Sequence, residues 1–160
     1  MPIGGRGTLL FHRPLDYLYK MKNKINFIPG LGEKPKEYKA LSKYLNIVDI
    51  DWNNGKVRFG KVDTLIGFSM GAVIACEYST KHKLKNLILC SLTPGAESLN
   101  MVKADNIIFL VGEKEKWVLK EINRVRKTLK CKNSVIVVPG SDHKITGKYQ
   151  EELLQIIQKL

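Results

Sequence analysis

Short apolar runs alternate with segments of helical periodicity along most of the chain. Leu87-Ile88-Leu89-Cys90 and Ile107-Ile108-Phe109-Leu110-Val111 are continuous apolar runs. Such runs are typical of strands that are covered on both faces, as in a parallel sheet between two layers of helices. On this pattern we predict six strands, at Ile25–Pro29, Asn46–Trp52, Asp63–Phe68, Leu87–Leu92, Asn106–Val111 and Ser134–Val138.

The segments between these runs have helical patterns. In one of them Leu119, Ile122, Val125 and Leu129 fall on one stripe, with charged residues elsewhere. Alternation of strands and helices predicts an α/β fold with right-handed crossovers: a three-layer α/β/α sandwich around a mostly parallel sheet of about six strands. The predicted helices are Lys36–Leu45, Met70–His82, Val118–Lys130 and Lys148–Leu160.

Two of the connections are short. Asn53–Val62 and Thr93–Asp105 are close to the minimum of about a dozen residues for a crossover between parallel strands. Neither segment has room for a long helix with its loops. We therefore expect a trimmed fold without an inserted lid.

The first twenty residues differ from the rest, because they contain Arg6 and Arg13 but a single lysine. We interpret 21–160 as one domain and 1–20 as an N-terminal extension. Two interpretations of the extension stay open. It is either foreign to the native chain or an amphipathic helix around Leu15–Lys22 that packs on the sheet edge.

Composition narrows the class of protein. The 160 residues suit one domain, and no apolar run approaches the 18 residues of a membrane-spanning helix. The N-terminus lacks the apolar stretch of a signal peptide. The three cysteines are not paired in sequence, and Cys76 and Cys90 fit buried free thiols of a reducing compartment. These features predict a cytoplasmic protein.

The formal net charge of +12 raises the question of a nucleic-acid or membrane partner. The basic residues are scattered, and no block of five or six like charges occurs. We therefore predict a solvated basic surface, with no nucleic-acid or membrane partner. The alternative is a charge field that favours an anionic substrate or partner. The oligomeric state stays open.

The strongest motif is Gly67-Phe68-Ser69-Met70-Gly71, between an apolar strand and a helix rich in small residues. A G-x-S-x-G sequence in a strand–turn–helix context exposes the serine above the sheet and aims the helix N-terminus at it. This motif resembles the nucleophile elbow of the α/β-hydrolase superfamily, and the resemblance covers about residues 24–160. It implies a doubly wound sheet that lacks or replaces the first two strands of larger members, with Ser69 as nucleophile.

Other landmarks of the family occur along the chain in the expected order. Pro29-Gly30-Leu31-Gly32 stands where many members have His-Gly-x-Gly, with Pro29 in place of the histidine. By resemblance, the backbone N–H groups of Leu31 and Met70 would form the oxyanion hole.

His143 is the candidate base, because it follows a strand at the same sheet edge as Ser69. His12 lies in the extension, and His82 ends a helix between two lysines. The acid should follow Gly112, where the family often has Asp at the third position and this chain has Glu115. Glu113 and Asp142 are the rival acids.

Four residues are candidates for the lining of a substrate pocket: Trp117, Pro94, Leu31 and Met70. The segment Thr93-Pro94-Gly95 would form one wall of this pocket. The alternative is that these residues only pack against their neighbours. We expect no metal and no cofactor, because no C-x-x-C, H-E-x-x-H, dinucleotide or phosphate-loop pattern is present.

Together these features predict a serine hydrolase with a Ser69–His143–Glu115 triad. It would cleave a small carboxylic ester or thioester, because a site without a lid favours small substrates over long lipids. The alternative is a non-catalytic binding protein with the same fold, suggested by the trimmed fold, the Glu at the acid position and the basic surface.

Overall fold

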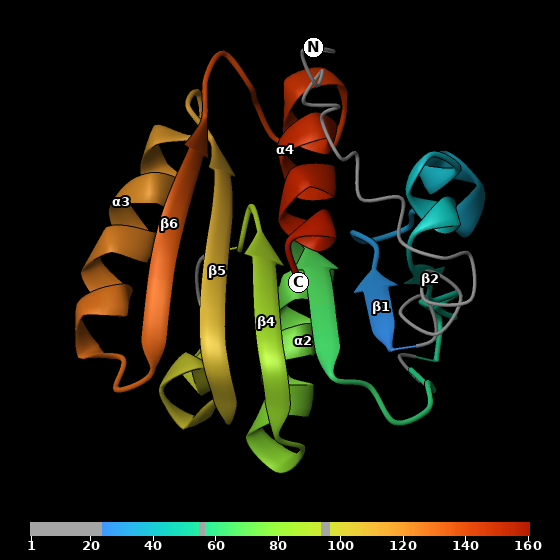
Figure 1. Ribbon diagram of the computed structural model, residues 1–160, viewed down its shortest axis with the longest axis horizontal. Helices are drawn as coiled ribbons and strands as arrows, with labels where there is room; N and C mark the ends of the chain where they lie inside the picture. Colours follow the sequence, from blue (N-terminus) through green and yellow to red (C-terminus); the bar gives the residue numbers. More distant parts are fainter. Residues whose placement is uncertain (1–23, 55–56, 94–96) are drawn as a thin grey trace, which may run out of the picture.

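One open sheet of six parallel strands forms the centre of the computed structural model, which describes residues 24–54, 57–93 and 97–160 (Figure 1). The order across the sheet is β2-β1-β3-β4-β5-β6, and all neighbours are parallel. All the strands therefore present their carboxyl ends at one edge. The strands are β1 (Ile25–Ile28), β2 (Asn46–Ile47), β3 (Thr64–Phe68), β4 (Leu84–Cys90), β5 (Ala104–Gly112) and β6 (Lys132–Val138).

Helices cover both faces of this sheet, which confirms the predicted three-layer architecture. In Figure 1, α4 (Gly147–Gln158) lies in front of the sheet and α2 (Met70–Lys81) lies behind it. Together with α3 (Lys116–Val125), α2 packs on a core that includes Leu87 and Phe109. On the other face, α4 packs on a second core. The free thiols of Cys76 and Cys90 are buried, as predicted.

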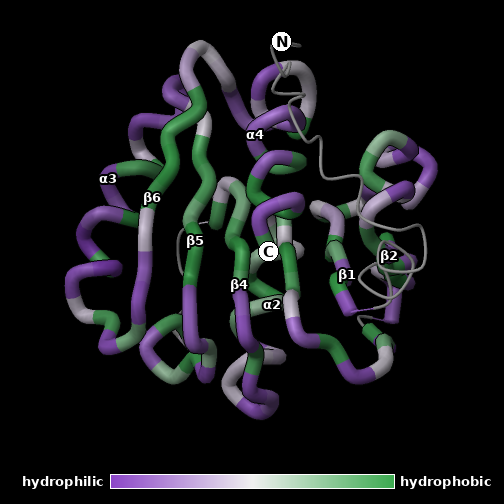
Figure 2. The backbone as a smooth tube through the Cα atoms, viewed as in Figure 1, coloured by the Kyte–Doolittle hydropathy of each residue, from purple (hydrophilic) through white to green (hydrophobic). Residues whose placement is uncertain are grey.

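Hydropathy changes along the length of the central strands. Figure 2 shows apolar residues in the carboxyl halves of β4, β5 and β6, whereas the amino ends are hydrophilic and carry Lys85, Asp105 and Lys132. The apolar halves of these strands thus lie next to the edge of the sheet from which the site loops emerge (Figure 2).

The prediction of one helix over Lys36–Leu45 is wrong. Two short 3-10 helices, η1 (Pro35–Tyr38) and η2 (Leu41–Lys43), occupy this segment. The turns of this segment are closed by hydrogen bonds between residues three apart, from the N–H of Glu37 to Lys34 at 3.0 Å and from the N–H of Tyr44 to Leu41 at 2.9 Å. The Ser42 hydroxyl also donates to the Lys39 carbonyl, at 2.7 Å, in competition with a regular helix. The apolar stripe was nevertheless correct, because the Tyr38, Leu41 and Leu45 side chains are buried.

The predicted strand Asn46–Trp52 is also too long. Pairing with β1 ends where the N–H of Val48 donates to Phe27 at 2.9 Å. β1 itself ends at Ile28, before Pro29, which has no N–H for a sheet ladder. No further pairing with β1 follows, and the segment turns at Asp51, whose carboxylate accepts the N–H of Asn53 at 3.0 Å.

The remaining helices follow the prediction closely, except that Val118–Lys130 divides. α3 ends at Val125, and a 3-10 turn, η4 (Arg126–Thr128), follows it. The short connection between β4 and β5 contains only the 3-10 helix η3 (Glu97–Met101) in its described part. Within the described ranges, no helix is long and apolar enough to cross a membrane. The proposed extension 1–20 lies outside them.

Candidate active site

A sharp turn between β3 and α2 carries Ser69. Its backbone has a φ of 55° and a ψ of −117°, a conformation that is strained for any residue with a side chain. The N–H of Ser69 donates to the carbonyl of Cys90 at 2.9 Å, and its own carbonyl accepts the N–H of Ala72 at 3.0 Å. The turn therefore holds the serine at the carboxyl edge of the sheet, where the motif predicted it.

Gly71 brings the start of α2 against the end of β1. A Cβ at Gly71 would lie 2.1 Å from the carbonyl oxygen of Ile28 and 2.4 Å from that of Pro29. Only glycine permits this approach. As a result, the Pro29–Gly32 segment lies next to the turn that carries Ser69.

The imidazole of His143 connects Ser69 to Glu115. Its Nε2 is 2.9 Å from the Ser69 Oγ, and its Nδ1 is 2.5 Å from the Glu115 Oε1. Because an ionised carboxylate can only accept, Nδ1 carries the proton donated to Glu115 and Nε2 is free to accept the Ser69 hydroxyl. The structure thus brings together the three side chains that the sequence selected.

The rival carboxylates lie elsewhere. Glu113 is exposed, and its carboxylate accepts the N–H of Gly140 at 2.7 Å. Asp142 is exposed as well and makes no described side-chain hydrogen bond to the imidazole. Of the three candidate acids, only Glu115 binds the imidazole of His143.

Burial and hydrogen bonding set the charge of this pair. The Glu115 side chain is 6% exposed, whereas that of His143 is 48% exposed. Burial by itself raises the pKa of Glu115, but hydrogen bonds from His143, Ser91 and the Gly112 N–H outweigh it and hold the pKa below its usual range. The hydrogen bond to Glu115 raises the pKa of His143 against the opposing effect of burial, and the charges of Glu115, Glu33 and Asp142 raise it further.

The loop that carries His143 has to cross over β5 to reach Ser69, because β6 is the outer strand. Gly112 makes this crossing possible, since a Cβ there would lie 2.4 Å from the carbonyl oxygen of Ser141. That carbonyl accepts the N–H of Lys114 at 3.0 Å. The ring of Phe68 then supports the imidazole, at 5.1 Å between ring centroids.

Glu33 closes the turn after β1 with both its backbone and its side chain. Its N–H donates to the carbonyl of Gly30 at 3.1 Å, and its carboxylate accepts the N–H of Gly30 at 2.7 Å. The buried Tyr38 donates its hydroxyl to the same carboxylate oxygen. Glu33 thereby anchors the turn that contains Leu31, whose own side chain is 66% exposed.

The predicted pocket residues have different positions. Trp117 lies at the start of α3 with 62% of its surface exposed, and Lys120 Nζ is 5.6 Å from its ring centre. Pro94 lies outside the described residues. Thr93 lies beside the nucleophile, since its Oγ1 is 3.4 Å from the Ser69 Oγ.

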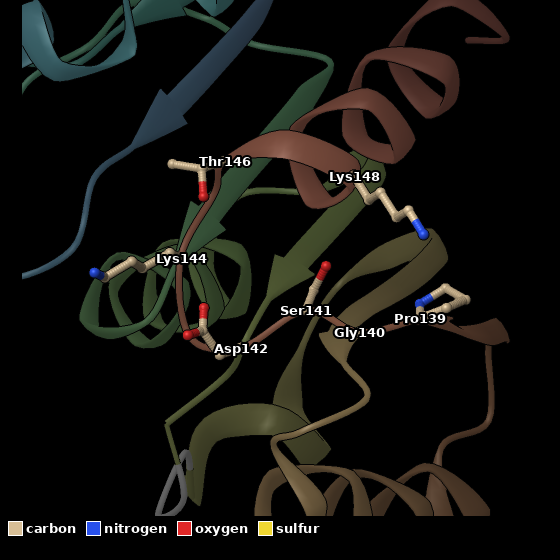
Figure 3. A pocket seen from close by; sticks show the side chains of 7 residues that line it. All are labelled: Pro139, Gly140, Ser141, Asp142, Lys144, Thr146 and Lys148. Carbon is tan, nitrogen blue, oxygen red and sulfur yellow. The ribbon is translucent and has the colours of Figure 1, made fainter.

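A shallow hollow of about 290 Å³ lies between the end of β6 and the start of α4 (Figure 3). It is lined by residues on both sides of His143 in the sequence. The side chains of Lys144 and Lys148 point in different directions in Figure 3 and do not converge on one point. The residues in this hollow are Pro139, Gly140, Ser141, Asp142, Lys144, Thr146 and Lys148.

Sequence reasoning missed Ser91, Tyr149 and Glu33. Ser91 Oγ donates to Glu115 at 2.6 Å and lies 2.7 Å from the Tyr149 hydroxyl. The position of Ser91, directly after β4 at the carboxyl edge, was a signal that could have found it. Tyr149 lies inside an amphipathic helix, where the pattern predicts only a core residue. No cluster of three or more metal-ligating side chains occurs in the described ranges.

The chain has the α/β-hydrolase fold. Solved structures with this architecture are similar to it, at low sequence identity. A dienelactone hydrolase from Anabaena variabilis is 13% identical, with a TM-score of 0.65 over 84% of this chain and 83% of that one. An acetyl xylan esterase from Paenibacillus is 10% identical, with a TM-score of 0.62 over 85% and 74%.

A phospholipase/carboxylesterase from Dyadobacter fermentans is 16% identical, with a TM-score of 0.58 over 88% of this chain and 92% of that one. No family model and no curated protein sequence matches the chain. At these identities the likeness establishes the fold, and the chemistry has to be argued from the site.

Proposed function

We propose that the protein is a serine hydrolase that cleaves a small carboxylic ester or thioester through an acyl-enzyme on Ser69. The observation that carries this proposal is the continuous set of hydrogen bonds from Ser69 Oγ through His143 to Glu115, at 2.9 and 2.5 Å. This is the geometry that a hydroxyl needs in order to lose its proton as it attacks.

In the first step, Ser69 Oγ attacks the substrate carbonyl carbon while His143 Nε2 takes the hydroxyl proton. Glu115 stabilises the resulting imidazolium through Nδ1–H. The imidazolium then protonates the leaving alcohol or thiol as its bond to carbon breaks. Water attacks the acyl-enzyme with His143 again as base, and the carboxylic acid and free Ser69 are released.

Two backbone N–H groups are the proposed oxyanion donors. Met70 is the first residue of α2, and the first N–H groups of a helix have no acceptor within it. Leu31 lies in the turn that Glu33 anchors, where the N–H of Gly30 is already bonded. The carboxylate thus leaves Leu31, and not Gly30, to donate. Removing such a donor costs about 3 kcal/mol of transition-state stabilisation.

The exposure of the site supports small substrates. His143 is half exposed, and the connections next to the site in the described residues are short loops.

A binding protein with this fold would not need a base aligned on a strained serine, because binding gains nothing from an activated hydroxyl.

The test is labelling by a fluorophosphonate probe together with turnover of nitrophenyl acetate and short acyl thioesters. We expect wild-type protein to be labelled at Ser69, and Ser69→Ala and His143→Ala to lose both labelling and turnover. Ser134→Ala, which changes an exposed serine on β6 that makes no described side-chain hydrogen bond, is the matched control and should react like wild type. Folded wild-type protein that stays unlabelled at high probe concentration would overturn the proposal in favour of the binding protein.

A further inference from the structure

Two buried hydroxyl groups continue the hydrogen-bond array beyond Glu115. Ser91, directly after β4, and Tyr149, in the first turn of α4, are both 0% exposed. Ser91 Oγ is 2.6 Å from Glu115 Oε2 and 2.7 Å from the Tyr149 hydroxyl oxygen. The mechanism above uses neither residue.

The direction of these hydrogen bonds follows from proton counting. Glu115 is ionised, so the contact with Ser91 requires the one hydroxyl proton of Ser91. The contact between Ser91 and Tyr149 then has to use the hydroxyl proton of Tyr149. The Tyr149 hydroxyl oxygen is also 2.8 Å from the carbonyl oxygen of Leu110, so Tyr149 shares its single proton between these two acceptors. The array thus runs from Tyr149 to Ser91 to Glu115: Ser91 donates to the carboxylate, and Tyr149 donates to both Ser91 and the Leu110 carbonyl.

The hydroxyl of Tyr149 is not needed to satisfy Leu110. The carbonyl of Leu110 already accepts the N–H of Ser91 at 2.8 Å. A phenylalanine at 149 would fill the same core without a buried polar atom, so the hydroxyl has a use beyond packing. Burial raises the pKa of Tyr149, which therefore remains a protonated donor at all working pH values.

Ser91 also has an unfavourable backbone conformation, with a φ of 46°. Glycine would adopt this φ without strain, whereas serine supplies the hydroxyl that glycine lacks. Strain retained at a fully buried position next to an active-site carboxylate indicates that the hydroxyl is used.

We propose that Ser91 and Tyr149 are positioning residues that hold the Glu115 carboxylate ionised and aimed at His143. This proposal rests on the proposed function. Ser91 and the Gly112 N–H, at 2.8 Å, occupy Oε2, so that Oε1 faces the imidazole and the carboxylate cannot rotate away. Because Tyr149 lies on the helix that follows the His143 loop, the pair also ties that loop to the end of β4.

The decisive variant is Ser91→Gly, which removes the hydroxyl and also relieves the strain of the positive φ at this position. We expect it to fold at least as stably as Ser91→Ala, and to lower kcat about 10- to 100-fold with little change in KM, the range for a hydrogen bond to a charged group. Tyr149→Phe should lower kcat less. The double variant Ser91→Gly/Tyr149→Phe should be no worse than Ser91→Gly, because Tyr149 acts through Ser91.

A second readout does not depend on turnover. The hydrogen bond from Ser91 lowers the pKa of Glu115, so ¹³C NMR titration of the glutamate carboxyls should show that pKa rising in Ser91→Gly. Ser79→Ala removes another buried serine hydroxyl, one that donates to the Cys76 carbonyl at 2.7 Å, and should change neither kcat nor the Glu115 titration.

Ser91→Gly with wild-type kcat and an unchanged Glu115 titration would overturn this inference while leaving the proposed function intact. An inactive, unlabelled wild-type protein would instead refute the proposed function. In that case the titration alone decides whether the hydroxyl array holds the carboxylate, and an unmoved pKa rejects it.

Discussion

The imidazole Nε2 of His143 lies 2.9 Å from the hydroxyl oxygen of Ser69, although 74 positions separate the two residues in the chain. Ser69 follows β3 and His143 follows β6, and β4 and β5 lie between these strands in the sheet. The contact depends on a loop that passes over the end of β5, which makes it sensitive to changes far from either residue.

Gly112→Ala should break this contact without touching either partner. The new Cβ would meet backbone atoms of Ser141 and Asp142 at 2.4 to 2.8 Å and push the His143 loop away from Ser69. Overpacking of this kind costs about 1 to 3 kcal/mol of the free energy of unfolding. Denaturant unfolding and esterase activity measure both effects. Gly60→Ala adds a Cβ with nothing within 4 Å and should change neither, and an active Gly112→Ala would contradict the account of the crossing.

The pH dependence of activity follows from the raised pKa of His143. His143 acts as a base only when neutral, so kcat/KM should increase with pH through its pKa. The acid limb should therefore lie above the value of about 6.5 for an unperturbed imidazole. A pH–rate profile, with ¹H NMR titration of the imidazole, measures it. An acid limb at or below the ordinary histidine value would contradict the coupling to Glu115.

The pKa shifts of His143 and Glu115 also make the free energy of unfolding depend on pH, in a direction that can be stated. A histidine whose pKa is higher in the folded state than in the unfolded state adds stability below its unfolded pKa and loses it as pH rises through the folded pKa. Glu115, whose pKa is lowered, adds stability above its unfolded pKa and loses it as pH falls through the folded one. In Glu115→Gln, the loss of stability on acidification should therefore be smaller than in wild type.

Glu115→Gln should lower kcat by about three to four orders of magnitude, as expected when the charge that orients the imidazole is removed. The amide has nearly the shape of the carboxylate but cannot stabilise the imidazolium. Glu113→Gln, two residues earlier in the same loop, is the matched control, because its carboxylate binds the Gly140 N–H and not the imidazole. Steady-state kinetics with nitrophenyl acetate compare the two. Equal effects would show that Glu113 shares the role of the acid.

Two variants, Glu33→Gln and Tyr38→Phe, distinguish the effect of the Glu33 charge on His143 from the effect of its hydrogen bonds on the turn after β1. The charge of Glu33 contributes to the raised pKa of His143, so Glu33→Gln should move the acid limb of kcat/KM to lower pH. Tyr38→Phe removes a hydrogen bond to Glu33 but leaves its charge, and should leave the acid limb in place. Both variants should lower kcat by about tenfold if the anchored turn holds Leu31 as an oxyanion donor. An acid limb that does not move in Glu33→Gln would contradict the electrostatic part of this prediction.

Much of the architecture could be predicted from local pattern. Continuous apolar runs located the four longest strands, because strands of a parallel sheet between layers of helices are rich in apolar residues. The region Lys36–Leu45 shows the limit of this reasoning. Its apolar spacing correctly marked the buried side chains, but side-chain and turn hydrogen bonds decided the backbone conformation.

The sequence by itself determined the serine turn, the order of the elements and a short set of candidate site residues, because glycine spacing and apolar runs act over a few neighbouring positions. Only the tertiary structure decided which carboxylate faces His143. Glu113 and Glu115 are two residues apart in one loop. A different loop, which runs from β6 over Gly112, brings the N–H of Gly140 to Glu113 and the imidazole of His143 to Glu115. The tertiary structure also decided that Ser91 meets Glu115 across 24 positions of sequence and meets Tyr149 across 58. Such pairings depend on strand order and crossover geometry, which no local pattern contains.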